Sequence, residues 1–116
     1  MLELVKLRAS QLNGCAYCLD MHSKDARAAG ETEQRIYLLS AWREAPFYTP
    51  RERAALAWTE AVTQIAAGVD EALQASVRAE FNDKELVGLT LAVIAINGWN
   101  RLAIALGAAV GSYVAS

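Results

Sequence analysis

The residues best suited to chemistry lie within eight positions of one another near the start of the chain. Cys15, Cys18 and His22 are the two cysteines and the one histidine among 116 residues. A thiolate is a nucleophile, and a second thiol nearby can capture the oxidised sulfur as a disulfide. A histidine beside the pair can accept and return a proton near neutral pH. The cluster therefore predicts a small thiol redox protein.

The spacing of these three side chains suits one face of a helix. At about 100° per residue they lie within roughly 60° of one another. Cys15 follows Asn13 and Gly14 at the expected start of that helix, where free backbone N–H groups and the helix dipole stabilise a thiolate. His22 follows Cys18 by four residues, one turn further along. Helix position favours Cys15 as the thiolate and proximity to His22 favours Cys18, so both assignments stay open.

A zinc site is the sharper alternative for the same cluster. Two thiolates and an imidazole supply three ligands, and a closed structural site needs a fourth. The chain has no further cysteine or histidine, so Asp20, Asp25 or Glu3 would have to complete the site. A plainer alternative is that the cysteines are small buried residues without chemistry. The sole histidine on the same helix face favours the redox interpretation over both.

Two carboxylates near the cluster have more than one candidate partner. Glu3 reaches the imidazole of His22 if the first helix folds back beside the second, and otherwise it pairs with Lys6 three residues along. Spacing alone favours Lys6. Asp25 suits the imidazole and solvent-exposed pairing with Lys24 equally well.

Composition limits the classes of partner and the compartment. The net charge is −2 with both signs interspersed, so no basic stripe predicts nucleic-acid binding. Hydrophobic residues make up 54% of the chain, and such an excess in a small protein often ends in a subunit interface. The first residues lack the pattern of a secretory signal, so we expect a cytoplasmic protein. In that compartment a Cys-x-x-Cys pair is typically catalytic or metal-binding.

The elements that must position the cluster are all predicted to be helices. Helix-forming residues dominate, prolines are few, and apolar and polar residues do not alternate, so we expect an all-α fold in a single domain over residues 1–116. Capping signals place helices at 2–12, 15–30, 32–42, 50–67, 70–81 and 83–114.

The last of these helices is the longest. At 1.5 Å per residue it would span about 45 Å, so we expect it to bend at Asn97-Gly98 or to extend against a neighbouring subunit. Either outcome favours an oligomer. Asn97, Asn100 and Arg101 interrupt its apolar stretches, so we do not expect a membrane span.

Several stretches together resemble a known family. Residues 3–22 carry a glutamate followed by Cys-x-x-Cys-x-x-x-His, and residues 24–27, 30–31, 42–44, 52–56 and 97–102 extend the match to about residue 105. These segments are similar to the alkylhydroperoxidase D-like (AhpD-like) branch of the carboxymuconolactone decarboxylase family. The resemblance implies an all-helical bundle of about six helices that assembles into trimers or hexamers and needs no cofactor.

The resemblance also implies a role for each site residue. Cys18 would attack a hydroperoxide or disulfide, Cys15 would resolve the product, His22 would relay protons and Glu3 would support His22. A dithiol such as a lipoyl group or a small redox protein would then restore the pair. Some family members carry histidine where this chain has Tyr17. The alternatives are a decarboxylase-like enzyme acting on a small lactone, with incidental cysteines, and a non-catalytic helical oligomer.

Overall fold

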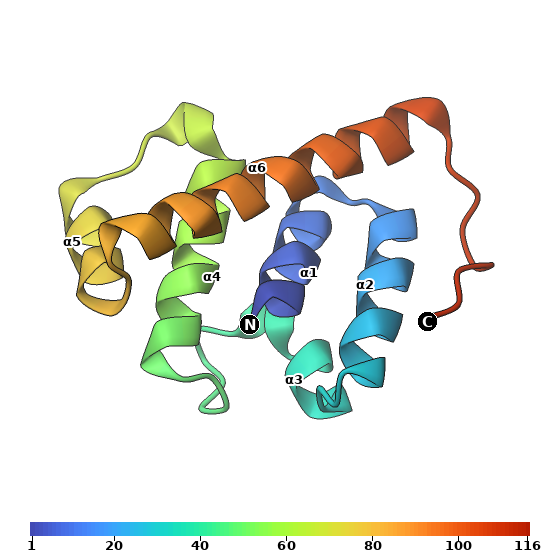
Figure 1. Ribbon diagram of the computed structural model, residues 1–116, viewed down its shortest axis with the longest axis horizontal. Coiled ribbons are helices and arrows are strands. Elements are labelled where there is room, and N and C mark those ends of the chain that lie inside the picture. Colours follow the sequence, from blue (N-terminus) through green and yellow to red (C-terminus); the bar gives the residue numbers. More distant parts are fainter.

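The computed structural model describes residues 1–116 and contains six α-helices and no strand (Figure 1). The all-α prediction is confirmed. Short 3₁₀ turns cover Leu39–Ala41 and Ile65–Ala67. The α-helices are α1 (Leu2–Asn13), α2 (Ala16–Ala28), α3 (Glu33–Tyr37), α4 (Pro50–Thr63), α5 (Glu71–Glu80) and α6 (Asp83–Leu106).

Local sequence explains where most helices begin and end. Gly14 adopts a left-handed conformation with φ of 69°, which closes α1 as the Asn-Gly pair predicts. Thr49 and Glu52 form the predicted capping box at the start of α4. Asn82 and Glu85 form a second capping box, which starts α6. The two capping boxes satisfy backbone N–H groups that no helical carbonyl can reach, whereas the N–H of Gly14 donates to a carbonyl at the end of α1.

The prediction of one helix over residues 32–42 is wrong. Helix α3 ends at Tyr37, and a 3₁₀ turn over Leu39–Ala41 follows it. Leu39 and Trp42 are both buried in one hydrophobic cluster. Residues three apart lie on the same side of a 3₁₀ turn, so this geometry directs both side chains into the core.

Two other helices end earlier than the sequence predicts. Helix α4 stops at Thr63, and its last predicted turn is the 3₁₀ turn over Ile65–Ala67. Helix α6 stops at Leu106 instead of residue 114, because Gly107 takes a left-handed conformation with φ of 70°. The helix continues through Asn97 and Gly98. The residues after Gly107 form a tail without regular structure that returns beside α2 (Figure 1).

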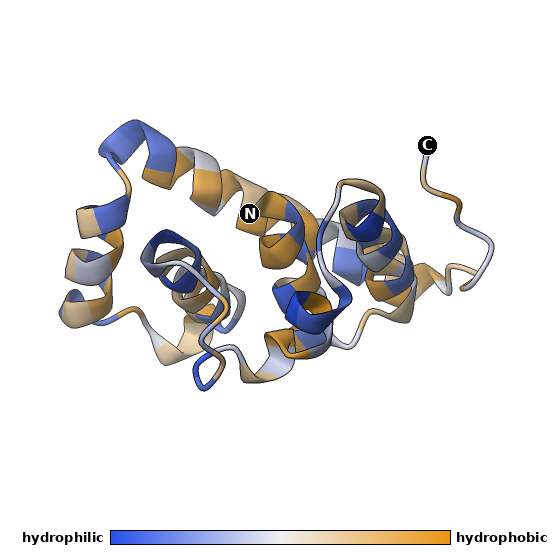
Figure 2. Ribbon diagram, turned by 90° about the horizontal axis from the view of Figure 1, so that it is seen from below, coloured by the Kyte–Doolittle hydropathy of each residue, from blue (hydrophilic) through white to orange (hydrophobic).

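Helix α1 lies at the centre of the molecule. It packs against α2 on one side and α4 on the other, and α6 crosses all three (Figure 1). Apolar and hydrophilic residues alternate around most of the helices (Figure 2). The apolar sides form two clusters: one consists of Leu4, Leu7, Ala26, Leu39, Trp42, Ala45, Tyr48 and Leu56, and the other of Val5, Ala55, Val77, Phe81, Leu86, Leu89 and Val93.

A buried polar network joins the end of α1 to the middle of α6. The Nδ2 group of Asn13 donates hydrogen bonds to Asn97 Oδ1 at 2.8 Å and to Asn100 Oδ1 at 2.9 Å. Asn100 is fully buried and donates to Ser10 Oγ at 3.0 Å. Because unpaired buried polar groups are costly, this network fixes the position of the turn that leads into α2.

Helix α6 is long and apolar enough to cross a membrane by length and composition alone, and 22% of its most apolar window is buried. Helix α6 contacts α1, α2, α4 and α5. In its second half, Asn97 and Asn100 accept hydrogen bonds from Asn13. Composition of this kind also suits a helix that another subunit covers. Its large exposed apolar side chains are Val87, Leu91, Ile94, Trp99, Leu102, Ile104 and Leu106.

Candidate active site

The two cysteines meet at the start of α2. Cys15 is the residue that caps this helix, and its sulfur accepts a hydrogen bond from the backbone N–H of Cys18 at 3.3 Å. The two residues form a disulfide, with their Cα atoms 5.3 Å apart. Both side chains are almost completely buried. The disulfide therefore joins two neighbouring positions at the start of α2 and links no separate helices.

Helix packing places Glu3 of α1 beside His22 of α2. Glu3 Oε2 lies 3.1 Å from His22 Nδ1, and Glu3 Oε1 lies 3.4 Å from Lys6 Nζ. His22 and Lys6, which the sequence offers as alternative partners of Glu3, thus both contact its carboxylate. The side chain of His22 is 12% exposed and that of Glu3 is 30% exposed, so this pair lies close to solvent but under partial cover.

A cavity of about 700 Å³ between α2 and α6 adjoins the disulfide. Cys18 and His22 line it, whereas Cys15 does not. Most of the wall is apolar. The remaining lining residues are Lys6, Tyr17, Met21, Ala92, Ala95, Ile96, Trp99, Leu102, Ala103, Leu106 and Ala108. Of the two sulfurs, Cys18 is therefore the one that a molecule in this cavity can contact.

The C-terminal tail adds a contact near the imidazole that sequence reasoning missed. Tyr113 Oη donates a hydrogen bond to Asp25 Oδ1 at 2.7 Å, and Lys24 Nζ donates one to the Tyr113 carbonyl at 2.9 Å. The hydrogen bond to Asp25 raises the pKa of the Tyr113 hydroxyl. Asp25, Glu3 and His22 each have a potential ligand atom within 4.8 Å of the others. No motif in the sequence signals that the tail returns to this point.

The arrangement differs from the zinc site that the sequence allowed. Both sulfurs are joined in the disulfide and so offer no thiolate to a metal. Asp20 pairs with Lys24 at 3.0 Å. Glu3, His22 and Asp25 form a group with the side-chain types that hold a metal, but Lys6 already binds Glu3 and Tyr113 already binds Asp25. In this structure each of the three side chains has a hydrogen-bond partner within the protein.

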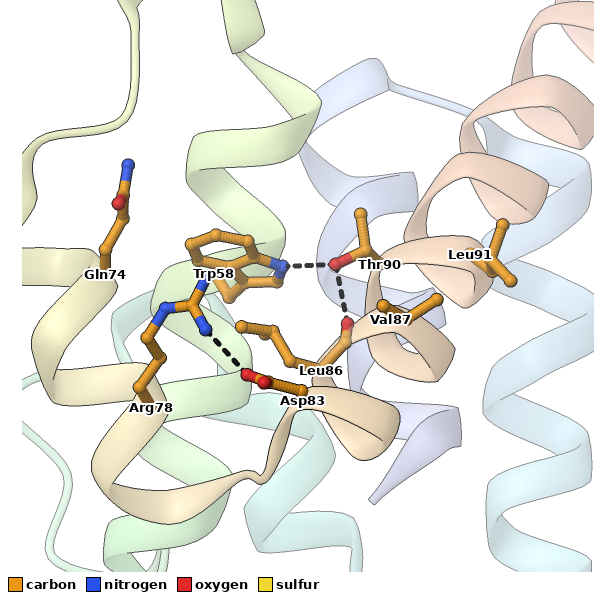
Figure 3. Close-up of a pocket in the computed structure, with 8 residues that line it drawn as sticks. All are labelled: Trp58, Gln74, Arg78, Asp83, Leu86, Val87, Thr90 and Leu91. Carbon is orange, nitrogen blue, oxygen red and sulfur yellow. Dashed lines mark hydrogen bonds and ion pairs between the residues drawn. The ribbon is translucent and has the colours of Figure 1, made fainter.

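A second cavity, of about 500 Å³, lies between α4, α5 and the start of α6 (Figure 3). Trp58 Nε1 donates to Thr90 Oγ1 at 2.9 Å, and Thr90 donates to the Leu86 carbonyl at 2.7 Å. Arg78 pairs with Asp83 at 2.7 Å. The polar groups joined in Figure 3 bind one another, and the lining contains no cysteine or histidine. Of these two cavities, the first is the one lined by a cysteine and the histidine.

Sequence comparison agrees with the resemblance carried by the cysteine cluster. Residues 1–61 match the sequence model of the carboxymuconolactone decarboxylase family. The uncharacterised protein YdfG of Bacillus subtilis is 51% identical over 106 residues, which cover 90% of this chain and 72% of YdfG. The uncharacterised protein YnjA of Escherichia coli is 30% identical over 88 residues, which cover 76% of this chain and 48% of YnjA.

Solved structures share the fold. A protein of unknown function from Agrobacterium tumefaciens, described as a putative antioxidant defence protein AhpD, has a TM-score of 0.93 and 48% sequence identity. The match covers 97% of this chain and 77% of that protein. An uncharacterised peroxidase-related protein from Silicibacter has a TM-score of 0.84 and 26% identity, and the match covers 96% of this chain and 59% of that protein. The predicted helical bundle with a long C-terminal helix is thus confirmed.

Proposed function

The chain belongs to the carboxymuconolactone decarboxylase family, and from this premise we propose that it is a cytoplasmic thiol-dependent peroxidase or disulfide reductase of the AhpD-like type. One observation carries the proposal: Cys18 and His22 line the same cavity while Glu3 binds the imidazole from outside it. This arrangement offers a substrate one sulfur and one proton relay. The relative described as a putative antioxidant defence protein supports the same role.

In the proposed reaction the reduced Cys18 thiolate attacks the distal oxygen of a hydroperoxide. An S–O bond forms, the O–O bond breaks, and the leaving alkoxide takes a proton through His22 to become an alcohol. Cys15 then attacks the Cys18 sulfenic acid, which forms the disulfide and releases water. With a disulfide substrate, Cys18 instead forms a mixed disulfide and the first substrate thiol leaves; Cys15 then attacks the Cys18 sulfur, which forms the Cys15–Cys18 disulfide and releases the second thiol.

An external dithiol, such as a lipoyl group or a small redox protein, completes the cycle. Its thiolate attacks the disulfide and the mixed disulfide resolves, so the dithiol is oxidised and both cysteines are reduced. The position of Cys15 at the cap of α2 assists reduction, because the N–H of Cys18 and the helix dipole stabilise a thiolate there. Cys15 is therefore well placed to serve as the leaving group and later as the resolving thiol.

Steady-state turnover of a hydroperoxide with a dithiol tests this proposal. The wild type should consume peroxide in proportion to dithiol oxidised, and a variant with both Cys15→Ser and Cys18→Ser should lose this activity. The competing decarboxylase-like role requires no thiol. Lactone decarboxylation that survives in the double variant, together with no peroxide turnover in the wild type, would favour the competitor.

We also propose that the chain acts as a homo-oligomer, a trimer or a hexamer, through the outer face of α6. Val87, Leu91 and Ile94 follow one another at helical spacing, and each exposes more than half of its side chain. None of these three residues is charged, and exposed apolar patches of this kind typically mark subunit interfaces. None of the three lines the cavity beside Cys18.

A further inference from the structure

We propose that the cavity beside Cys18 selects hydroperoxides that combine an apolar body with a carboxylate, and that Lys6 is the residue that binds the carboxylate. This inference rests on the proposed peroxidase function and names its substrate class. The oxidant that Cys18 reduces is then an amphipathic organic anion, such as a fatty-acid hydroperoxide. Hydrogen peroxide should oxidise Cys18 more slowly.

The wall of the cavity favours an apolar body. Its side from α6 is built from alanine, isoleucine, leucine and tryptophan side chains, and Met21 contributes from α2. Such a surface gains free energy by excluding water when an alkyl or aryl group covers it. The volume of about 700 Å³ is of the size that binds organic ligands. Hydrogen peroxide is too small and too polar to use this surface.

Lys6 is the one lysine, arginine or carboxylate side chain in that wall. The side chain of Lys6 is 32% exposed. Its Nζ atom lies 3.4 Å from Glu3 Oε1, a distance longer than that of a strong charge-assisted hydrogen bond. An ammonium group has three N–H donors, so donors remain for a ligand. Glu3 does not line the cavity, so a carboxylate bound beside Lys6 would share the ammonium group with a partner that lies outside that wall.

The carboxylate orients the substrate and takes no part in the bond changes. Lys6 of α1 and Cys18 of α2 line the same cavity, so a molecule held at Lys6 by its anionic end can present its peroxide to the sulfur. The thiolate attacks the distal oxygen, the O–O bond breaks, the alkoxide is protonated to an alcohol, and Cys15 closes the disulfide with release of water. The dithiol reductant proposed above then restores both thiols.

The test compares a fatty-acid hydroperoxide with its methyl ester, in which a neutral ester replaces the charged carboxylate and the rest of the molecule is unchanged. Single-turnover oxidation of the reduced protein is followed by stopped flow, with both oxidants below their micelle concentrations. We expect the wild type to react about fivefold faster with the acid than with the ester, as a partly exposed ion pair allows. Lys6→Met should bring the acid-to-ester ratio close to one, and Lys6→Arg should retain the preference.

The ratio of the acid rate to the ester rate separates carboxylate binding by Lys6 from effects of Lys6 on the reactivity of Cys18. A change at Lys6 that acts through Glu3 and His22 alters both rates alike and cancels in the ratio. Lys84→Met removes the same charge from an exposed position at the start of α6 and should keep the wild-type ratio. Equal rates for acid and ester in the wild type, or a ratio unchanged in Lys6→Met, overturn the inference while the peroxidase function stands. Failure of both oxidants to form the disulfide overturns the peroxidase function, and the inference with it.

Discussion

Glu3 Oε2 lies 3.1 Å from His22 Nδ1, a contact between the first turn of α1 and the second turn of α2. A carboxylate on Nδ1 favours the tautomer with the proton on that nitrogen, which leaves Nε2 as the acceptor. His22 also lines the cavity that contains Cys18. The pair therefore provides an oriented base in the wall of the same cavity as the sulfur that a substrate can contact.

Replacing Glu3 tests whether this contact supports the reaction. Glu3→Gln keeps the shape of the side chain and removes the charge that holds the imidazole, so we expect the rate of Cys18 oxidation to fall about tenfold. Stopped-flow oxidation of the reduced protein measures this rate. Glu71→Gln, at an exposed position at the start of α5, is the matched control. A Glu3→Gln rate equal to the wild-type rate would show that the contact is only structural.

A charge on the outer face of α6 tests the proposed oligomer. Ile94 exposes 56% of its side chain, so Ile94→Lys should leave the fold intact if the chain is a monomer. In a subunit interface the same change buries an unpaired charge and should shift the protein to smaller species. Sedimentation velocity measures the change in mass. A wild type that sediments as a monomer would contradict the proposal directly.

The acid stability of the fold should depend on Glu60. Burial pushes the pKa of its carboxyl up, but hydrogen bonds from Arg43, Trp42 and Arg8 outweigh burial and hold that pKa below its ordinary value. The stabilisation is therefore present above about pH 4.5 and is lost as the pH falls through the lower pKa of the folded state.

Glu60→Gln should reduce the free energy of unfolding by about 2 kcal/mol at pH 7, because it weakens hydrogen bonds to a charged acceptor. Urea unfolding at pH 7 and at pH 2.5 measures the difference between the two proteins. The difference in the free energy of unfolding should narrow at the lower pH, because the wild-type carboxyl takes up a proton as the pH falls toward its lowered pKa in the folded state. A gap that stays constant between the two pH values would contradict this role for Glu60.

The hydroxyl of Tyr113 should hold the C-terminal tail against α2. Its pKa is raised by the hydrogen bond to Asp25, so the contact is present below the ordinary tyrosine pKa of about 10 and is lost as the pH rises through the raised value. Tyr113→Phe removes the bond at every pH. Limited proteolysis should cleave residues 108–116 faster in this variant at neutral pH, and equal cleavage rates would show that the bond does not hold the tail.

Sequence predicts the parts of the site that depend on local signals. Gly14 closes α1, Cys15 begins the next helix, and the spacing to His22 follows from helix geometry, so the cluster itself is predictable. The partner of Glu3 is different. Spacing favours Lys6, and only the family resemblance points to His22, while the structure contains both contacts.

The remaining differences arise from long-range packing. The 3₁₀ turn after Tyr37 forms where Leu39 and Trp42 enter the core, and helix propensity contains no information on that burial. The contact between Asp25 and Tyr113 joins residues 88 positions apart, without a motif at either end. Helix α6 ends at Leu106 because Gly107 takes a left-handed conformation, whereas the predicted helix over residues 83–114 includes this glycine.

Single-turnover oxidation with mass spectrometry tests most directly whether Cys18 is the attacking sulfur. The reduced wild type should form the Cys15–Cys18 disulfide upon addition of one equivalent of hydroperoxide. Cys15→Ser should react as fast in the first step and stop with a sulfenic acid on Cys18, whereas Cys18→Ser should react slowly and form no such product. A Cys18→Ser variant that consumes hydroperoxide as fast as the wild type would contradict the account.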